Sequence, residues 1–427
     1  MNITLEKPVY GGDFLGHVEG KAIFVPLTLP GETVSAHITE EKRSFAKAEL
    51  DTILTSSPNR VAPNCPHFGS CGGCHYQHAD YPTQLALKQQ ILRETLTRAN
   101  VPIPAEIDIL AGEPWAYRNR IRLALTRNRE LAYRSRRSHD LIAISECPIA
   151  APSLLRTATQ VAEFLLKNPS PIPISELELF TNQNESELLL TLFTETASAS
   201  DPQEWLAALQ ASLQPQASSI RLQLNDGGLS PSILASIGQP SLNYTAAGFS
   251  YRVDHGAFFQ VNRHLIDDFA SLVTGDHSGN LAWDLYAGVG LFARQLAARF
   301  AQVIAVESAP ASEAALLHNL ALTNTSANAG TVTSSTLDFL RRNRELREPR
   351  PDLIILDPPR AGLGDQVTAL LNAIHAPAIV YVSCDPATLA RDLRRLTQER
   401  YLVENITLVD MFPQTFHLET VVRLRRS

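Results

Sequence analysis

Apolar and polar residues alternate in short runs over the first part of the chain, and glycine turns such as Gly11-Gly12 and Gly20 separate the runs. A period of two predicts half-buried β-strands, and several short strands at this spacing are typical of a small barrel of the OB type. We therefore expect a barrel over residues 1–56. Basic residues in one of its loops follow two acids, which favours a solvated turn of mixed charge; they are Lys42, Arg43 and Lys47.

The middle of the chain, residues 57–249, mixes helical and strand periods. Three stretches repeat apolar residues at helical spacing, and short β-rich runs lie between them. This mixture predicts an α+β central domain. The expected helices cover residues 86–99, 154–166 and 205–213.

Apolar runs in the last part of the chain are each followed by a polar residue. Short runs rich in Val, Ile and Leu are typical of strands buried in a parallel sheet, and ligands bind at the carboxyl ends of such strands. We expect residues 250–427 to form a Rossmann-like α/β domain. Its strand ends carry the candidate site residues Asp284, Glu307, Asp357 and Cys384.

The first of these strands leads into a glycine turn that suits a nucleotide-like ligand. Asp284, Gly288 and Gly290 form an Asp-x-x-x-Gly-x-Gly pattern, and Glu307 follows twenty-three residues after Asp284. An acid at about this distance binds ribose hydroxyls. The pattern resembles the turn found with S-adenosylmethionine rather than with dinucleotides. A purely structural turn in an unrelated α/β protein is the alternative.

Two prolines and Arg360 follow Asp357. This segment resembles the Asn/Asp-Pro-Pro-aromatic signature of methyltransferases that act on exocyclic amino groups, in which the aromatic ring holds the flat target. Arg360 stands in the place of that ring, so amino methylation is disfavoured and a charged substrate suits the site. The alternative is a strand stopped by two prolines, with Asp357 solvated at its end.

Cys384 follows a run of β-forming residues and precedes a proline that prevents the strand from continuing. A cysteine is often a small buried hydrophobe, but polar Ser383 and Asp385 flank this one. As a nucleophile it would solve a chemical problem, because C5 of uracil is a poor nucleophile until a thiolate adds at C6 and makes C5 enolate-like. The C5 proton must then be removed by a base. Glu419 is the candidate, since an acid is costly on the last apolar strand.

Five cysteines, an odd number, argue against a disulfide framework and for metal binding or catalysis. Cys65, Cys71 and Cys74 form a tight triplet, with two glycines between the last two. Zinc sites usually come as two close pairs of ligands, whereas a triplet with Cys147 as the distant partner is closer to an iron–sulfur cluster. The spacing favours a cluster over zinc, and unliganded thiols are the remaining alternative.

The net charge of −7 counts against nucleic-acid binding for the chain as a whole, but the charges are segregated. Residues 118–137 hold eight arginines and one acid, whereas residues 176–204 hold seven acids and no Lys or Arg. Alternate arginines predict a strand with one cationic face, and interleaved tyrosines favour binding of RNA phosphates with base stacking over a solvated sheet face. The residues are Arg118, Arg120 and Arg122, with Tyr117 and Tyr133.

Together these motifs are similar to those of the RNA 5-methyluridine methyltransferase family, in its iron–sulfur branch with a TRAM domain that modifies bacterial 23S rRNA. The resemblance covers nearly the full length and includes Phe258-Phe259-Gln260 and His417-Leu-Glu419. It implies Cys384 as nucleophile, Glu419 as proton acceptor and a [4Fe-4S] cluster on the four other cysteines. It also implies S-adenosylmethionine contacts from Gln260, Tyr286, Gly288, Gly290, Glu307 and Asp357. The family often has Asn where this chain has Leu291.

The start of the chain shows no signal peptide, and no apolar run is long enough to span a bilayer, so we expect a cytoplasmic protein, acting as a monomer. The same chemistry on tRNA is an alternative, although shorter bacterial tRNA relatives lack the cluster and the barrel. A non-catalytic RNA-binding assembly factor is an alternative from another class, and the presence of both Cys384 and Glu419 argues against it. A radical enzyme is set aside because its cluster typically needs a Cys-x3-Cys-x2-Cys triplet.

Overall fold

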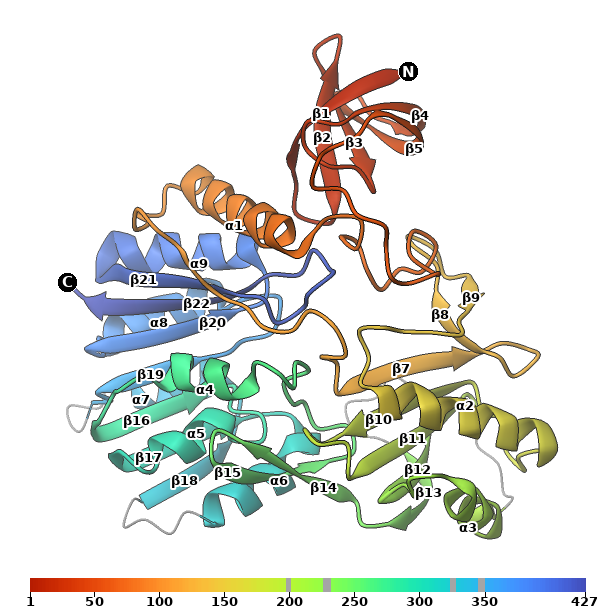
Figure 1. Ribbon diagram of the computed structural model, residues 1–427. Helices are drawn as coiled ribbons and strands as arrows, with labels where there is room; N and C mark the ends of the chain where they lie inside the picture. Colours follow the sequence, from red (N-terminus) through yellow and green to blue (C-terminus); the bar gives the residue numbers. More distant parts are fainter. Residues whose placement is uncertain (197–200, 226–231, 323–327, 345–349) are drawn as a thin grey trace.

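The computed structural model describes residues 1–427 except 197–200, 226–231, 323–327 and 345–349. The chain forms a small barrel, a mixed sheet flanked by two helices, and a larger sheet with helices on both faces (Figure 1). None of the helices in the described ranges is long and apolar enough to cross a membrane.

The N-terminal strands close into the predicted barrel, in the order β1-β2-β3-β5-β4. Alternation puts Leu5, Phe14 and Val25 in its core. Glu40 pairs with both Lys42 and Lys47, which confirms a mixed-charge segment, although Lys47 lies on a strand. The strands are β1 (Asn2–Pro8), β2 (Asp13–Val18), β3 (Lys21–Pro26), β4 (Thr33–Glu41) and β5 (Phe45–Thr55).

The middle of the chain forms a seven-stranded sheet in the order β13-β12-β11-β10-β7-β8-β9. The helices expected over 154–166 and 205–213 are α2 (Pro152–Lys167) and α3 (Gln203–Ser212), and their leucines pack on the sheet. The strands are β7 (Arg120–Leu125), β8 (Leu131–Arg134), β9 (Leu141–Ala143), β10 (Glu176–Thr181), β11 (Leu188–Thr194), β12 (Ser219–Leu224) and β13 (Ile233–Gly238).

The C-terminal part is built on an eight-stranded sheet in the order β18-β17-β16-β19-β20-β22-β21-β6. The first five strands are parallel neighbours, as predicted for a Rossmann-like domain, and β22 runs antiparallel to β20 and β21. The strands are β6 (Asp108–Leu110), β16 (Gly279–Leu285), β17 (Phe300–Glu307), β18 (Asn328–Thr333), β19 (Leu353–Leu356), β20 (Ala378–Ser383), β21 (Tyr401–Val409) and β22 (Glu419–Arg426).

Helices cover both faces of this sheet and bury two separate cores. A hairpin and three helices pack on one face: β14 (Ser241–Ala246), β15 (Phe249–Asp254), α4 (Ile266–Thr274), α5 (Leu291–Leu296) and α6 (Pro310–Ala321). Four helices pack on the other face: α1 (Tyr81–Arg98), α7 (Thr336–Asn343), α8 (Gly364–Ile374) and α9 (Pro386–Glu399).

Three elements from the stretch expected to be central domain pack with this sheet: α1, β6 and β14. Helix α1 buries Ile91, Leu92 and Leu96 against its second core, β6 pairs in parallel with β21, and β14 packs in the first core. The sheet needs apolar cover beside α9, and β21 would otherwise present an open edge. The boundary expected at residue 249 stays a prediction, and packing alone places these three elements with the C-terminal sheet.

Candidate active site

The candidate residues meet at one edge of the C-terminal sheet. Strands β16, β17, β19 and β20 are parallel neighbours, so their carboxyl ends lie side by side. Those ends place Asp284, Glu307, Asp357 and Cys384 at the same edge. This is the edge at which ligands bind in open α/β sheets.

The glycine turn after β16 requires unusual backbone conformations. Gly288 and Gly290 have φ of 55° and 89°, and Tyr286 also has a positive φ of 65°. A Cβ on Gly290 would stand 2.9 Å from a methyl of Leu316, so both conformation and space select glycine there. Glu307 accepts the Gly288 N–H at 2.8 Å, which holds its carboxylate against the turn.

A small cavity opens between this turn and the segment that follows β15. Gln260, Tyr286, Gly288 and Asp357 line it together with the half-exposed ring of Phe258. The Gln260 amide donates to Asp357 at 3.4 Å. Four of the predicted S-adenosylmethionine contacts thus surround one space, while Glu307 faces the turn and Gly290 begins α5.

Leu291 also lines this cavity, and its side chain is buried. The chain therefore presents an apolar group where its expected relatives often carry an amide. Its backbone carbonyl is engaged by the Tyr251 hydroxyl at 3.0 Å. A ligand in the cavity meets hydrophobic contact at this point instead of a hydrogen bond.

Cys384 lies in a two-residue link, Cys384 and Asp385, between β20 and α9. Asp385 is the N-cap of α9 and accepts the N–H groups of Ala387 and Thr388 at 3.0 and 2.9 Å. Pro386 occupies the first helical turn, where its missing N–H costs nothing. The prediction of a thiol at the end of a strand is confirmed, and the local sequence explains why the chain turns there.

Glu419 begins β22, which is antiparallel to β20. The last registered pair is Ser383 with Thr420, so Cys384 and Glu419 occupy the next facing positions. Glu419 is 5% exposed, and burial together with the charge of Asp357 raises its pKa well above the usual range. A carboxyl group with a raised pKa is suited to hold and release a proton near neutral pH.

The acids around the thiol affect one another. Burial and the charge of Glu307 raise the pKa of Asp357 to about 7, which disagrees with a freely solvated strand end. Burial, Glu419 and Asp357 raise the pKa of Cys384 to about 12, while Arg360 lowers it. In the absence of substrate the thiol is therefore held in its protonated form.

This electrostatic coupling predicts a pH profile for alkylation of Cys384. Without ligands the thiol should react slowly with iodoacetamide at pH 8, and the rate should rise up to pH 10 as thiolate forms. Glu419→Gln removes a negative neighbour, so thiolate should form at lower pH and alkylation should be about three- to tenfold faster at pH 9. Mass spectrometry of the Cys384 peptide measures the rate.

The exposed-surface variant Glu130→Gln, which alters a β7–β8 turn remote from the thiol, is the matched control. It should leave the alkylation rate of Cys384 unchanged. Equal pH profiles for Glu419→Gln and the unmutated protein would contradict the coupling.

Arg360 reaches the mouth of the site, as its place in the motif predicts. Its guanidinium lies 3.2 Å from the ring nitrogen Nδ1 of His417, two residues before Glu419. Its positive charge also lowers the pKa of Glu419 against the effect of burial. The side chain is exposed, so it can also contact a charged substrate.

Sequence reasoning missed two groups that shape this mouth. Tyr10, from the turn after β1 of the barrel, packs on Phe416 with ring centroids 5.4 Å apart, and burial and the charge of Asp385 raise its pKa. Lys88 of α1 and Asp410 form a fully buried pair at 2.5 Å, and Lys88 also donates to the Phe412 carbonyl. These contacts hold the segment that leads to Glu419. No local pattern relates residues 10 or 88 to the site.

The four remaining cysteines lie near the boundary between the cysteine segment, residues 65–74, and β8: Cys71 bridges to Ser135, the residue after β8, and Cys147 influences the pKa of both Cys71 and Cys74. Cys71 accepts the Gly73 N–H at 3.4 Å, and the Tyr133 hydroxyl lies 3.8 Å from the sulfur of Cys147. Burial raises the pKa of Cys71, and nearby Cys147 and Cys65 raise it further. Within the described ranges, no three His, Cys, Asp or Glu side chains are grouped closely enough to hold a metal ion.

The predicted cationic strand is only partly present. Arg118 lies partly buried near Cys147 and lines the groove between the barrel and the central sheet, and Arg120 lies over the Phe180 ring and 3.7 Å from Glu178. Arg122 pairs with Glu176 at 2.6 Å. The prediction that all three arginines face RNA is therefore wrong for Arg120. The acidic strand β10 pairs with β7 and takes up much of its charge.

Tyr117 is not available for stacking on bases, because it is fully buried and donates to the Pro413 carbonyl at 3.1 Å. This corrects the interpretation of Tyr117 from the sequence. Tyr133 is partly buried: its ring packs against the core of the central sheet with its hydroxyl at Cys147, and it also lines the groove between the barrel and the central sheet. Stacking of a base on Tyr133 stays a prediction.

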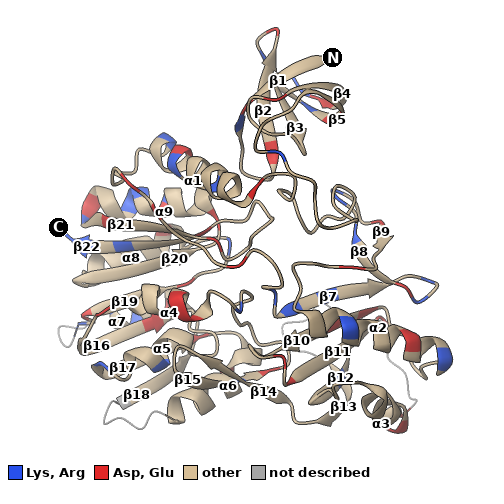
Figure 2. Ribbon diagram, viewed as in Figure 1, with Lys and Arg blue, Asp and Glu red and all other residues tan. Residues whose placement is uncertain are grey.

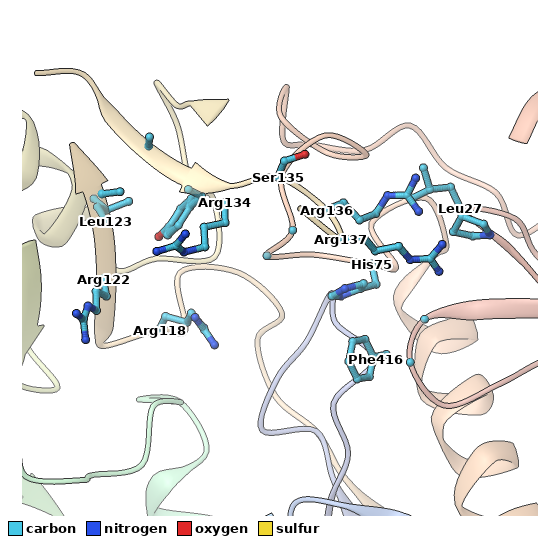
Figure 3. Close-up of a pocket in the computed structure, with 18 of the residues that line it drawn as sticks. Leu27, His75, Arg118, Arg122, Leu123, Arg134, Ser135, Arg136, Arg137 and Phe416 are labelled. Atoms are coloured by element: carbon cyan, nitrogen blue, oxygen red, sulfur yellow. The ribbon is translucent and has the colours of Figure 1, made fainter. Parts of the chain in front are cut away.

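A groove of about 730 Å³ lies between the barrel, the cysteine segment and the central sheet (Figure 3). Figure 3 shows His75 and Phe416 close together on one side and Arg118, Arg122 and Arg134 on the other. Ion pairs fix its walls, because Arg136 binds Glu49 at 2.5 Å and Arg137 binds Asp13. Its rings and guanidinium groups are the chemistry that binds unpaired bases and phosphates.

The chain matches a family model described as tRNA (Uracil-5-)-methyltransferase over residues 80–427, and one described as TRAM domain over residues 1–50. It is 32% identical to the 23S rRNA (uracil(1939)-C(5))-methyltransferase RlmD of Shewanella frigidimarina, over 99% of this chain and 95% of that protein. The protein of the same name from Pectobacterium atrosepticum is 33% identical, over 96% of this chain and 90% of its own length.

A solved structure of similar fold is the tRNA (uracil-54, C5)-methyltransferase of Pyrococcus abyssi in complex with S-adenosyl-L-homocysteine. The two chains superimpose with a TM-score of 0.79 at 25% identity, over 99% of this chain and 100% of the other. The likeness therefore includes the barrel and the central sheet as well as the C-terminal sheet.

Proposed function

The chain belongs to the tRNA (Uracil-5-)-methyltransferase family, and on this premise we propose that it transfers a methyl group from S-adenosylmethionine to C5 of one uridine in 23S rRNA. S-adenosylmethionine-dependent methylation of RNA uracil at C5 is the activity of the family. The observation that carries the proposal is the register of β20 and β22, which sets Cys384 opposite Glu419, together with the effect of the Glu419 charge on the pKa of the thiol. Relatives named for 23S rRNA favour that substrate.

The proposed reaction assigns one step to each of these two residues. The Cys384 thiolate adds to C6 of uracil, and the electrons of the C5–C6 double bond become an enolate with nucleophilic character at C5. S-adenosylmethionine supplies the methyl group to C5. Glu419 then takes the C5 proton, the double bond reforms, and the thiolate leaves C6. The cycle ends with Cys384 as thiolate and Glu419 as a protonated carboxyl, and loss of that one proton to solvent returns both groups to the state in which they began.

The cavity beside the glycine turn is the proposed site for S-adenosylmethionine. The turn offers backbone and the carboxylate of Glu307 to a ribose, and Gln260, Tyr286 and Asp357 surround the rest of the space. Its walls mix apolar and polar groups, as a site for a nucleoside with a charged sulfur requires. Gly288 and Gly290 let the ligand approach the backbone closely.

The groove of Figure 3 is the proposed path of the RNA next to the target uridine. The barrel forms one wall of it through Gly11 and Leu27, which supports the expected RNA-binding role of residues 1–56. We propose three functional parts, residues 1–56, 57–249 and 250–427, with α1, β6 and β14 assigned to the third by packing.

Mapping of 5-methyluridine tests the function. RNA from a strain that lacks the gene should miss one 5-methyluridine in 23S rRNA, and the purified protein should restore it in vitro with labelled S-adenosylmethionine. Loss from tRNA alone would transfer the assignment to tRNA, the second candidate, which the likeness to the Pyrococcus abyssi enzyme favours. RNA binding without any transfer would contradict the enzyme assignment.

A [4Fe-4S] cluster on Cys65, Cys71, Cys74 and Cys147 is proposed as a structural element. Four thiols are the ligands that such a cluster takes, their charges influence one another, and the Gly73 N–H points at a sulfur. In the described ranges the side chains are not grouped closely enough to hold a metal ion as they stand, so binding would draw the four sulfurs together. When bound, the cluster would tie the cysteine segment to β8. The reaction transfers no electrons, so no redox role is assigned.

Anaerobically purified protein is accordingly expected to be brown, with about four irons and four inorganic sulfides per chain. Cys147→Ser should lose the cluster and lower thermal stability, because the segment would lose its anchor to the central sheet. Cys384→Ser is the matched control and should keep full iron content. Stoichiometric zinc without visible absorbance would contradict the cluster.

A further inference from the structure

A second groove, of about 670 Å³, runs between the C-terminal part of α1 and helix α9. Every charged side chain that lines it is an arginine: Arg98 from α1 and Arg391, Arg394 and Arg395 from α9. Small residues, among them Ala99 and Ala390, form its floor. Helices α1 and α9 pack against each other, and Figure 2 shows Lys or Arg positions in blue on both.

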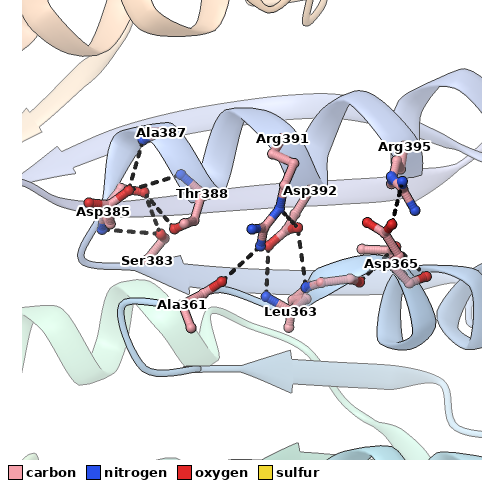
Figure 4. A network of polar contacts seen from close by, with 12 residues as sticks. Ala361, Leu363, Asp365, Ser383, Asp385, Ala387, Thr388, Arg391, Asp392 and Arg395 are labelled. Atoms are coloured by element: carbon pink, nitrogen blue, oxygen red, sulfur yellow. Dashed lines mark hydrogen bonds and ion pairs between the residues drawn. The ribbon is translucent and has the colours of Figure 1, made fainter.

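The arginines keep hydrogen-bonding capacity toward the groove. Arg391 donates to Asp392 at 2.9 Å and to the Ala361 carbonyl at 2.8 Å, and Arg395 pairs with Asp365 at 2.8 Å (Figure 4). Asp392 is fully buried and also accepts the Leu363 N–H and the Tyr381 hydroxyl, so its charge is directed inward. Each guanidinium has five donors and uses only some of them here.

Arg394 shows this unused hydrogen-bonding capacity most clearly. Its side chain is exposed and forms no ion pair with any residue in the described ranges. Arg391, Arg394 and Arg395 lie three and four residues apart, so their charges share one face of α9. Like charges at this spacing destabilise a helix, and an anion bound from outside would relieve that repulsion. Guanidinium groups bind phosphate in two-point contacts.

The groove reaches Ala387 in the first turn of α9, three residues after Cys384. Helix α9 begins two residues after Cys384. At about 1.5 Å per residue, Arg391 and Arg395 stand roughly 10 and 17 Å along the helix from the thiol. At about 3.4 Å per nucleotide along a strand, this distance corresponds to about three to five nucleotides. Arg391 also binds the loop that follows Arg360, next to the mouth of the site.

We propose that this arginine groove binds the phosphate backbone of substrate RNA a few nucleotides from the target uridine. The proposal rests on the proposed RNA methyltransferase function and adds a second contact surface to the groove of Figure 3. RNA is favoured over an acidic protein because the groove begins at the first turn of α9, beside the site that would take the target uridine. It holds the flanking strand, while Cys384 and Glu419 act on the base.

Anisotropy titrations with two kinds of RNA test the proposal. One 23S rRNA fragment ends two nucleotides from the target uridine on both sides, and two others are lengthened by eight nucleotides on the 5′ or the 3′ side. Arg394→Ala and Arg98→Ala should each weaken binding of one lengthened RNA about fivefold and lower its salt slope by about 0.7 to 0.9. Binding of the short RNA should not change.

Arg342→Ala removes an exposed arginine of α7 outside the groove and is the matched control. Equal losses of affinity for the short and the lengthened RNA, or no loss of affinity for any RNA, would overturn the proposal. A variant that binds every RNA normally but no longer binds an acidic protein would also overturn it. Methylation of the short RNA by the unmutated protein reports the proposed function separately, so failure of the groove and failure of the function are distinguishable. Unchanged thermal unfolding shows that the variants fold.

Discussion

Cys384→Ala is expected to abolish methyl transfer, with a fall of at least about 10⁴-fold in kcat. Without the thiol no C6 adduct can form, and C5 of uracil remains too weak a nucleophile to take a methyl group. The variant should also fail to trap RNA that contains 5-fluorouridine. With the unmutated protein that RNA should form a stable covalent complex, because fluorine cannot leave C5 as a cation. A denaturing gel with labelled S-adenosylmethionine shows each species.

The fold should survive this substitution, because Cys384 is only partly buried and the N-cap bonds of Asp385 do not involve it. Cys384→Ser keeps the shape of the side chain and should be equally inactive, since a hydroxyl gives far less anion than a thiol. RNA affinity should stay within about twofold for both variants. Normal methylation by Cys384→Ala would refute the assignment of the nucleophile and the mechanism with it.

Glu419→Gln should stop the cycle at a later point. The thiolate can still add and C5 can still take the methyl group, but the amide cannot accept the C5 proton. We expect a covalent protein–RNA adduct that carries the labelled methyl group, with turnover lowered by about 10²- to 10⁴-fold. The two variants thus separate the reaction into its first and last steps.

The unfolding temperature at two pH values is the control measurement for Glu419→Gln, because it shows whether this variant is folded. The pKa of the Glu419 carboxyl is raised in the folded protein by burial and by Asp357, so folding favours its protonated form. Its contribution to stability is therefore lost as pH rises through the raised pKa. Glu419→Gln should unfold at the same or a higher temperature than the unmutated protein at pH 8, and the difference should shrink at pH 5. Rapid turnover without adduct would identify another base.

Local sequence was sufficient for much of the C-terminal sheet and its site. Short apolar runs that end in Asp284, Glu307, Asp357 or Cys384 specify buried parallel strands, and parallel strands must bring their ends to one edge. The barrel was equally predictable, because alternation with a period of two fixes which side of each strand is buried. Positive φ at Gly288 and Gly290 follows from the turn that joins such a strand to a helix.

The mouth of the site could not be predicted in the same way. Tyr10 and Lys88 lie far along the chain from Cys384, and only the packing of the barrel and of α1 brings them to the segment before Glu419. The arginine groove likewise needs two helices from opposite ends of the chain. Contacts of this kind depend on how whole elements dock, which no local pattern records.

The distribution of charge shows most clearly what the sequence determined and what only the tertiary structure decided. The sequence by itself determined that arginines gather in residues 118–137 and acids in residues 176–204. Only the tertiary structure decided that β7 and β10 are neighbours, so that Arg122 and Arg134 share Glu176 and Arg120 faces Glu178. Opposite charges attract across a strand pair at a few ångströms, whereas distance along the chain leaves them independent. Much of the charge of the predicted cationic face is therefore paired with acidic residues of the neighbouring strand β10.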